Sequence, residues 1–257
     1  MRKKYSLVEQ LNPDYDLFLP SLSVDCVIFG FHANQLKVLL LKPIHNKEWA
    51  LPGGFVYKNE DVEDAATRIL KHRTKLKEVF LKQFYLFGSA KRTKQKHAKK
   101  LLKDSGIADV ENHWILQRFV SAGYYALVEY FNVHPGHDEI STECRWTDLE
   151  QLPDLIIDHR EIIEKALEAL QLHLNYEPIG YNLLPSEFTM KDLQSIYETI
   201  LGKKLDRANF QRKILNYGIL TKKEKHYSGG SHKAPFLYSF NKPAYFKALK
   251  NGLEKFW

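Results

Sequence analysis

The stretch Leu51–Leu76, LPGGFVYKNEDVEDAATRILKHRTKL, decides the fold of the N-terminal part of this 257-residue chain. It begins with a proline and two glycines, continues through an acidic segment and ends in a sequence of helical character. Within it, Gly54 is followed six positions later by Glu60 and eight positions after that by Arg68. We expect Glu60 and Arg68 to form an ion pair that ties the glycine-rich loop to the helix.

This spacing resembles the front half of the Nudix box, G-x5-E-x7-R-E-U-x-E-E-x-G-U, in which U is a bulky aliphatic residue. The resemblance implies that glutamates in the second half would lie on one helix and hold a divalent metal against a substrate diphosphate. In this chain Ile69, His72 and Arg73 occupy the three glutamate positions, and Lys75 replaces the closing glycine. We therefore expect a Nudix fold that lacks the hydrolytic site.

Positions 69, 72 and 73 share one helix face because their spacing is i, i+3, i+4. Carboxylates there would supply the hard oxygen ligands that magnesium prefers, which Ile69 cannot do. Arg73 would place a fixed positive charge where the cation should sit. His72 could ligate a softer metal, but a single histidine without carboxylate partners is more often an ordinary polar residue. The sequence predicts no enzyme activity, no metal site and no cofactor.

Composition favours a folded protein of the cytosol. A hydrophobic content of 44% and an aromatic content of 13% suffice for packed cores. Cys26 and Cys144 lie far apart and match no metal or disulfide spacing, which suits a reducing compartment. The N-terminal sequence MRKKYSLVEQLNPDYD lacks the apolar centre of a signal peptide, and no apolar run is long enough to span a membrane. We expect a cytoplasmic protein with no membrane partner.

The excess of positive over negative charge is confined to the C-terminal part of the chain. Residues 1–181 carry 24 Lys and Arg against 25 Asp and Glu, a net charge of −1. Residues 182–257 carry 14 against 6, a net charge of +8. This asymmetry indicates an anionic partner for the C-terminal part, most simply nucleic acid. A soluble basic helical domain is the alternative that charge alone leaves open.

The first part of the chain alternates strand and helix patterns, which predicts an α/β/α sandwich. A turn at Ala33-Asn34 should join two strands, and the helix after the glycine loop should be capped by Asn59 or Asp61. Asp158, with Glu161 three residues on, resembles a capping box. The expected strands are Val24–Phe31, Leu36–Lys42, Phe80–Ala90 and Arg118–Phe131, and the last helix is Arg160–Leu174. The basic run Lys91–Lys103 is interpreted as a solvated loop or helix face, with phosphate contact as the minor alternative.

Turn and breaker residues at 175–185 predict a boundary between a Nudix-like domain, 1–176, and a second domain, 183–257. Thr189 with Asp192 should cap a helix that ends at Gly202, and Asp206 should cap a second helix. Two short strands around a glycine-rich basic loop follow, and then a final helix. Helix, tight turn, helix and hairpin together predict a winged helix-turn-helix.

In the second of these helices Phe210, Ile214 and Tyr217 form the expected core stripe. Arginine and asparagine on another face have the shapes that read guanine and adenine edges in the major groove. The wing would contact phosphates or the minor groove. A protein-docking role is the alternative, since winged helices serve that purpose too. The predicted DNA-binding residues are Arg207, Asn209, Arg212, Lys213, Asn216, Lys223, Lys225, His232 and Lys233.

The arrangement of the whole chain resembles the Nudix-related transcriptional regulators of the NrtR type. The stretches that carry the resemblance are Trp49–Val56, the partial box of Gly54, Glu60 and Arg68, Ser121–Val128, Asp158–Ile163 and Leu183–Ile214. The last stretch is the most specific, because it contains the DNA-binding unit itself.

This resemblance implies a homodimeric regulator that binds a palindromic operator in double-stranded DNA and senses a small metabolite with its Nudix domain. Some members respond to ADP-ribose-like nucleotides, and one branch responds to sugars such as L-arabinose. The altered box lacks ligands for a metal that would neutralise a diphosphate, so a sugar effector is favoured. A nucleotide effector remains the alternative, because His72 and Arg73 could contact a phosphate directly. An active hydrolase of a nucleoside diphosphate derivative is the alternative function. The candidate effector-binding residues are Trp49, His72, Arg73 and Trp114.

Overall fold

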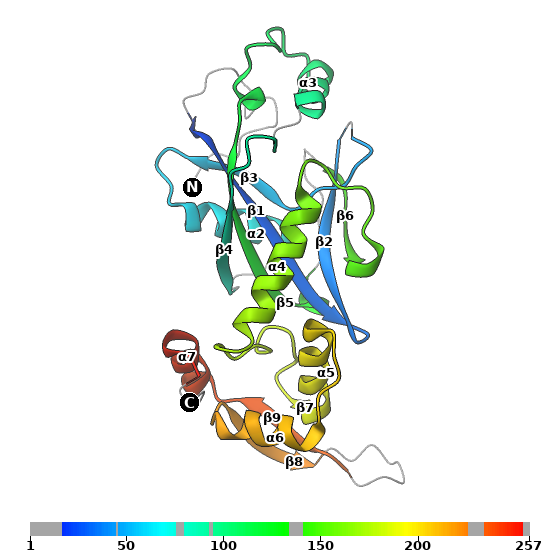
Figure 1. Ribbon diagram of the computed structural model, residues 1–257, viewed down its shortest axis with the longest axis vertical. Helices are drawn as coiled ribbons and strands as arrows, with labels where there is room; N and C mark the ends of the chain where they lie inside the picture. The colour runs from blue at the N-terminus through cyan, green and yellow to red at the C-terminus, as the bar shows by residue number, and fades with distance from the viewer. Residues whose placement is uncertain are drawn as a thin grey trace. The chain divides into compact units, whose positions relative to one another are not determined.

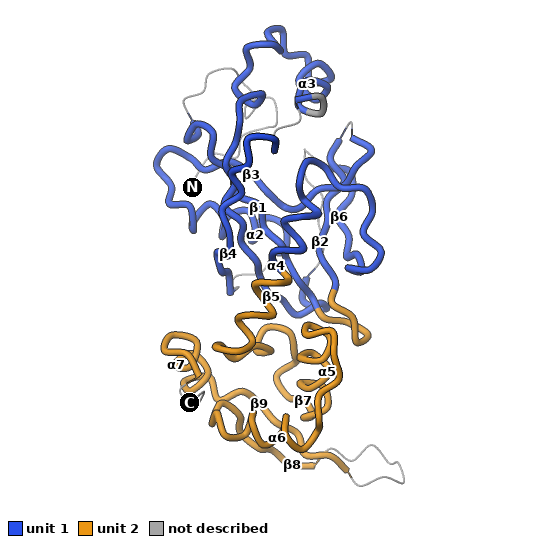
Figure 2. The backbone as a smooth tube through the Cα atoms, viewed as in Figure 1, with its two compact units in different colours: residues 1–30, 37–166 blue, residues 31–36, 167–257 orange. Residues whose placement is uncertain are grey.

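The computed structural model describes residues 17–44, 46–75, 80–92, 95–133, 141–225 and 234–253. The chain divides into two compact units, shown in Figure 2: residues 1–30 with 37–166, and residues 31–36 with 167–257. After the family that the sequence resembles, we call them the Nudix unit and the C-terminal unit. The domain limits expected from the sequence, 1–176 and 183–257, stay a prediction.

The Nudix unit is built on a six-stranded sheet in the order β4-β5-β1-β2-β6, with β3 paired to β1 in antiparallel fashion. Its strands are β1 Phe18–His32, β2 Gln35–Pro43, β3 Gly53–Tyr57, β4 Leu81–Phe87, β5 Val120–Glu129 and β6 Ser141–Asp148. The turn between β1 and β2 lies at Ala33 and Asn34, whose φ angles of 50° and 59° suit a tight hairpin. This confirms the expected turn, although β1 begins earlier than predicted.

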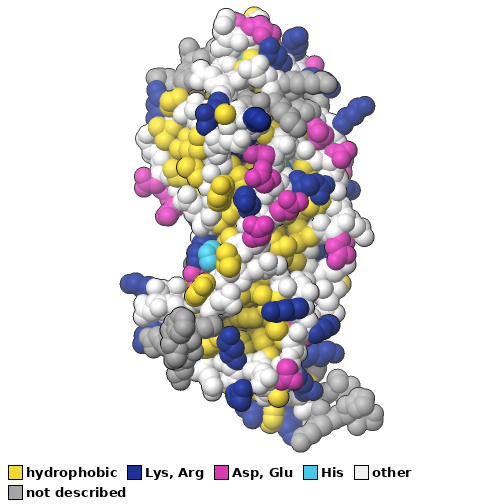
Figure 3. All heavy atoms as spheres, in the orientation of Figure 1, with side chains coloured by type: hydrophobic (Ala, Val, Ile, Leu, Met, Phe, Trp, Pro, Cys, Tyr) yellow, Lys and Arg dark blue, Asp and Glu magenta, His cyan; other side chains and the backbone are white. Residues whose placement is uncertain are grey.

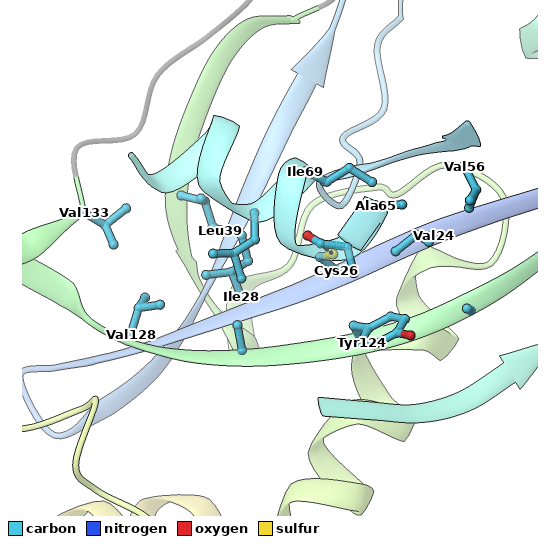
Figure 4. Packing of buried hydrophobic residues seen from close by; sticks show 14 residues of the cluster. Val24, Cys26, Ile28, Leu39, Val56, Ala65, Ile69, Tyr124, Val128 and Val133 are labelled. Atoms are coloured by element: carbon cyan, nitrogen blue, oxygen red, sulfur yellow. Dashed lines mark hydrogen bonds between the residues drawn. The ribbon is translucent and has the colours of Figure 1, made fainter. Parts of the chain in front are cut away.

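Helices cover both faces of this sheet, and the side chains of each strand point alternately to one face and to the other. Val24, Cys26 and Ile28 of β1 pack against helix α2, Val62–Thr74, as Figure 4 shows. The intervening residues of β1 point to the opposite face, across which α4, His159–His173, runs in Figure 1. These layers confirm the predicted α/β/α sandwich.

Helix α2 begins after Asp61 and ends at the position where the Nudix box has its closing glycine. Asp61 is the N-cap, one of the two expected caps, but its side chain makes no capping hydrogen bond. Lys75 ends the helix in the left-handed conformation, with φ of 60°, and its N–H donates to the carbonyl of Lys71. The Nudix box has glycine at this position, and a left-handed residue explains why, because glycine adopts it without the strain that a side chain adds.

The basic insert forms a helix, α3, at Gln95–Asp104. Its Leu102 is fully buried and packs with Val110 and Leu116 in a small separate core. Lys100 and Lys103 on this helix are exposed. The segment is therefore folded, and Lys100 and Lys103 are solvated as expected. Lys99 is half-buried and pairs with Glu111, and Arg92 of the same basic run is buried.

The C-terminal unit contains the helix-turn-helix and the hairpin that the sequence predicted. A three-stranded sheet in the order β7-β9-β8 lies with helices α5 and α6, and the chain continues into α7. The elements are β7 Phe188–Thr189, α5 Met190–Leu201, α6 Arg207–Asn216, β8 Leu220–Lys225, β9 Phe236–Phe240 and α7 Lys242–Asn251. This confirms the winged helix fold.

Local capping explains where these helices begin and end. Thr189 and Asp192 form a complete capping box at α5, and Gly202 ends the helix with a left-handed φ of 64°. The side chain of Asp206 accepts a hydrogen bond from the N–H of Asn209 at the start of α6. Each of these signals was predicted from the sequence, because each depends on residues a few positions apart.

Across the described parts of both units, we find no helix that combines the length and apolarity needed to cross a membrane.

Candidate functional site

The Glu60–Arg68 pair has the geometry that the sequence predicted. Arg68 donates from Nε to Glu60 Oε1 at 2.9 Å and from Nη2 to Glu60 Oε2 at 2.8 Å. The same Nη2 donates to the carbonyl of Phe55 in the glycine-loop strand at 2.8 Å. The guanidinium also lies over the Tyr57 ring, 4.5 Å from its centroid. The pair thus ties β3 to α2 and confirms its expected structural role.

The helix face that would carry the metal ligands is used for packing. Ile69 belongs to the main hydrophobic core. Arg73 is only 3% exposed, and its guanidinium donates to Ser141 Oγ at 3.3 Å. His72 is half-buried. Among the described residues there is no group of three or more His, Cys, Asp or Glu side chains that could hold a metal ion.

Trp114 lies at the centre of an aromatic cluster. Its ring is 4.7 Å from Phe55, 5.8 Å from Phe18 and 5.9 Å from Phe119, measured between centroids. Phe55 and Phe119 are half-buried, whereas Trp114 itself is buried. The indole therefore supports an aromatic surface and does not itself face solvent.

Trp49 has different surroundings. The Arg145 guanidinium lies 4.1 Å from its ring centroid. Its backbone N–H donates to the carbonyl of Asp154 at 2.8 Å, and its carbonyl accepts from the N–H of Ile156 at 2.9 Å. The structure thus gives Trp49, Trp114 and Arg73 different neighbours, and their role in effector binding stays a prediction, as does that of His72.

A buried ionic network that the sequence did not predict lies beside the glycine loop. Arg92 donates to Asp25 Oδ2 at 2.9 Å and to Asp158 Oδ2 at 2.6 Å. The Ser121 hydroxyl donates to the same Asp25 oxygen at 2.6 Å. His159 Nδ1 accepts from the Leu51 N–H at 2.8 Å. The network joins β1, β5, the segment after β4, the glycine loop and the start of α4.

This network corrects the capping box expected at Asp158 and Glu161. Asp158 Oδ2 holds Arg92, while the buried Oδ1 has no hydrogen bond from the described residues. The carboxylate is therefore used for a long-range ion pair and not for the helix terminus. An aspartate in the apolar strand sequence SVDCVIF was the signal that could have revealed the network, because a buried carboxylate needs a partner.

Burial determines the charges in this network. Burial opposes the charge of Arg92, yet its hydrogen bonds with Asp158 and Asp25 and their negative charges raise its pKa. Burial lowers the pKa of His159 and outweighs the opposing effect of Asp25. His159 is therefore neutral, with its proton on Nε2, because Nδ1 accepts from Leu51. Nε2 faces Asp25 Oδ1 at 3.7 Å.

The same network requires glycine in the loop. A Cβ added to Gly53 would lie 2.6 Å from Asp25 Oδ1 and 2.9 Å from the carbonyl of Val24. Both distances are too short for real atoms, so the close approach of β3 to β1 depends on the absence of a side chain. The loop is held by this packing from one side and by Arg68 from the other.

In the C-terminal unit, α6 presents the predicted residues to solvent. Asn209, Arg212 and Asn216 are exposed, and Arg212 Nη2 donates to Asn209 Oδ1 at 3.0 Å. Arg207 and Lys213 on the same helix are exposed too. On the face drawn in Figure 3, Lys and Arg side chains are more frequent than Asp and Glu over this unit. Asn209, Arg212, Lys213 and Asn216 lie within about 100° of one another around the helix and form one polar, basic surface, whereas Arg207 lies about 140° from Arg212.

The wing is described in part. Lys223 is exposed, whereas Lys225 is half-buried with its Nζ 5.3 Å from the Phe236 ring centroid. Lys222 Nζ lies 3.6 Å from the same centroid. His232 and Lys233 lie outside the described residues. Roles of all these residues in DNA binding stay predictions.

Fold and site together define a Nudix domain followed by a winged helix. Residues 19–169 match the family model of the Nudix domain, and residues 180–240 match that of the NrtR DNA-binding winged helix domain. The chain belongs to the Nudix family, and its architecture is that of the NrtR-type regulators.

Individual proteins support the same assignment. The ADPR responsive transcriptional repressor NtrR of Acinetobacter baylyi is 29% identical over 228 residues, 86% of this chain and 82% of that protein. The crystal structure of Shewanella oneidensis NrtR with a 27mer DNA has a TM-score of 0.67 and 26% identity, covering 88% of this chain and 95% of that one. An RNA pyrophosphohydrolase of Pelagibacter ubique is 29% identical over 141 residues, 52% of this chain and 85% of that protein.

The buried network leads to a stability prediction. Arg92→Met should leave Asp25 and Asp158 buried without their cation, which costs about 3–5 kcal/mol in the free energy of unfolding. The measurement is thermal and urea unfolding followed by circular dichroism. Arg118→Met is the matched control, because Arg118 is an exposed arginine that donates to the Gly88 carbonyl. Equal loss of stability in the two variants would contradict the structural role of the network.

Proposed function

We propose that this chain is a DNA-binding transcriptional repressor that acts as a homodimer and responds to an ADP-ribose-type nucleotide bound by its Nudix domain. The observation that carries the proposal is the surface of α6. Within a winged helix domain of NrtR type, this helix turns Asn209, Arg212 and Asn216 away from its buried residues, Phe210 and Ile214.

The chemistry of that surface suits the edges of bases in the major groove. Arginine recognises guanine through two parallel hydrogen bonds, and asparagine recognises adenine in the same way. Arg212 is also oriented by its hydrogen bond to Asn209, which reduces the freedom it would lose on binding. The relative of known structure was solved with DNA, and it covers most of this chain. These facts favour DNA over a protein partner.

The relatives favour a nucleotide effector over a sugar. The Acinetobacter baylyi repressor, which spans both domains, is described as responsive to ADPR. The sugar preferred from the sequence gains no support from these relatives. A metal is not the only means of holding a diphosphate, since backbone N–H groups and arginines also bind phosphate. The half-buried rings of Phe55 and Phe119 beside Trp114 offer a surface on which a nucleobase can stack.

A hydrolase is the alternative function, and the similarity of the Nudix domain to an RNA pyrophosphohydrolase is the observation in its support. We propose binding without hydrolysis. The observation behind this choice is that Ile69 and Arg73 are packed into the unit at the positions where the Nudix box has glutamates.

The first prediction from this proposal concerns DNA. Arg212→Ala should cost about 1–3 kcal/mol on a specific operator and relax the preference at one base position. Lys223→Ala and Lys225→Ala should weaken binding to all sequences and reduce the salt dependence, by about one unit of slope for each phosphate that is no longer neutralised. Fluorescence anisotropy with specific and random duplexes at several salt concentrations measures both effects. Unchanged operator affinity for Arg212→Ala would indicate that α6 contacts a protein.

A second prediction concerns the effector. ADP-ribose should raise the melting temperature of the protein, because a ligand that binds only the folded state stabilises it. L-Arabinose at the same concentration is the comparison, and the melting temperature should stay unchanged with it. Incubation of ADP-ribose with magnesium or manganese should release no product above background. Metal-dependent product release that disappears in Glu60→Ala or His72→Ala would establish the hydrolase instead.

The third prediction concerns assembly. One winged helix contacts few base pairs, so two copies on a palindromic site are needed for useful specificity. Light scattering at micromolar concentration should therefore give twice the mass of the chain. A monomer that binds one half-site as tightly as the whole palindrome would overturn the proposed homodimer.

A further inference from the structure

Helix α6 exposes a leucine next to the predicted base-reading arginine. Leu215 is 42% exposed, whereas Phe210 and Ile214 on the same helix are buried. A leucine at a solvated position loses the stabilisation that burial of its side chain would bring. Single exposed leucines are ordinary on protein surfaces, and what distinguishes Leu215 is its position beside Arg212.

The positions around Arg212 divide by chemistry. Since successive residues of a helix advance by about 100°, Leu215 lies about 60° to one side of Arg212 and Ala208 about 40° to the same side. Asn209 and Asn216 lie on the other side, about 60° and 40° away. All five are exposed. Exposed apolar residues thus lie on one side of Arg212, and exposed asparagines lie on the other.

We infer that Leu215 recognises the C5-methyl group of a thymine in the major groove. The methyl group is the apolar feature of base edges in that groove, and apolar side chains distinguish thymine by contacting it. The occupant is a thymine and not a protein side chain, because Arg212 next to Leu215, and the two asparagines on the far side of Arg212, suit base edges. Ala208, on the same edge, is small enough to let a base pair approach the helix.

Helix geometry also places this thymine. Leu215 lies three residues after Arg212, a rise of about 4.5 Å along the helix. Successive base pairs are about 3.4 Å apart. The thymine should therefore lie one or two base pairs from the guanine that Arg212 reads. Leu215 is then a specificity-determining residue of the proposed DNA-binding function, on which this inference rests.

The first test selects duplexes from a random-sequence DNA pool with the full-length chain, as wild type and as Leu215→Ala. Wild type should enrich a thymine within two base pairs of a guanine in each half-site. Leu215→Ala should keep the guanine and lose the preference for thymine. Leu172→Ala is the matched control, because Leu172 is a 60% exposed leucine of the same unit on α4, and it should enrich the wild-type sequence.

The second test changes the DNA and leaves the protein intact. Deoxyuridine in place of that thymine removes only the methyl group. Wild type should bind the substituted duplex about three- to fivefold more weakly per half-site, the loss expected for one buried methyl group. Leu215→Ala should bind the two duplexes equally, and Leu172→Ala should keep the wild-type difference. Fluorescence anisotropy titration gives these ratios.

The outcomes separate this inference from the proposed function. If the pool yields no enriched sequence even at low salt, the proposed DNA-binding function fails. If a sequence is enriched but deoxyuridine binds as well as thymine at every position, the assignment of Leu215 is overturned. An unchanged preference in Leu215→Ala overturns it too, and would assign the exposed leucine to a protein contact.

Discussion

The Nudix unit depends on the charge of Arg92, which is buried between Asp25 and Asp158. A buried guanidinium is tolerated only where carboxylates compensate it, and each carboxylate in turn needs the cation. This mutual requirement fixes the segment after β4 against β1 and the start of α4. His159 extends the same arrangement to the Leu51 N–H, where the glycine loop begins. The start of the loop is thus held by a hydrogen bond to the residue that follows Asp158 in the chain.

In this unit α2 retains the ion pair and the helix end expected of the Nudix box but lacks its metal-binding glutamates. Glu60 and Arg68 still connect β3 to α2, and Lys75 still takes the left-handed conformation that closes the helix. Ile69 contributes to the core and Arg73 bonds to Ser141 in place of a metal cluster. Packing and hydrogen bonding therefore stabilise this helix at positions where the Nudix box has glutamates.

In the C-terminal unit, the residues of α6 that form the core are different from those that face solvent. Phe210 of α6 packs on Tyr197 of α5, with centroids 5.2 Å apart, and these buried rings hold the two helices together. The outward residues of α6 contribute little to this core, because only one side of the helix is buried. Their identities are therefore free to follow the requirements of a partner, and they combine a cation, amides and apolar groups.

The sequence by itself determined the features that depend on residues close together in the chain. Gly54, Glu60 and Arg68 gave the loop–helix pair, and Thr189 with Asp192 gave the start of α5, since helix periodicity and capping act over a few positions. Tertiary structure alone decided the partners of Arg92, which is 67 residues from Asp25 and 66 from Asp158. Capping rules assigned Asp158 to its own helix, but a buried cation distant in sequence is the stronger competitor for its carboxylate. No local pattern encodes such a competition, because its outcome depends on which groups folding removes from water.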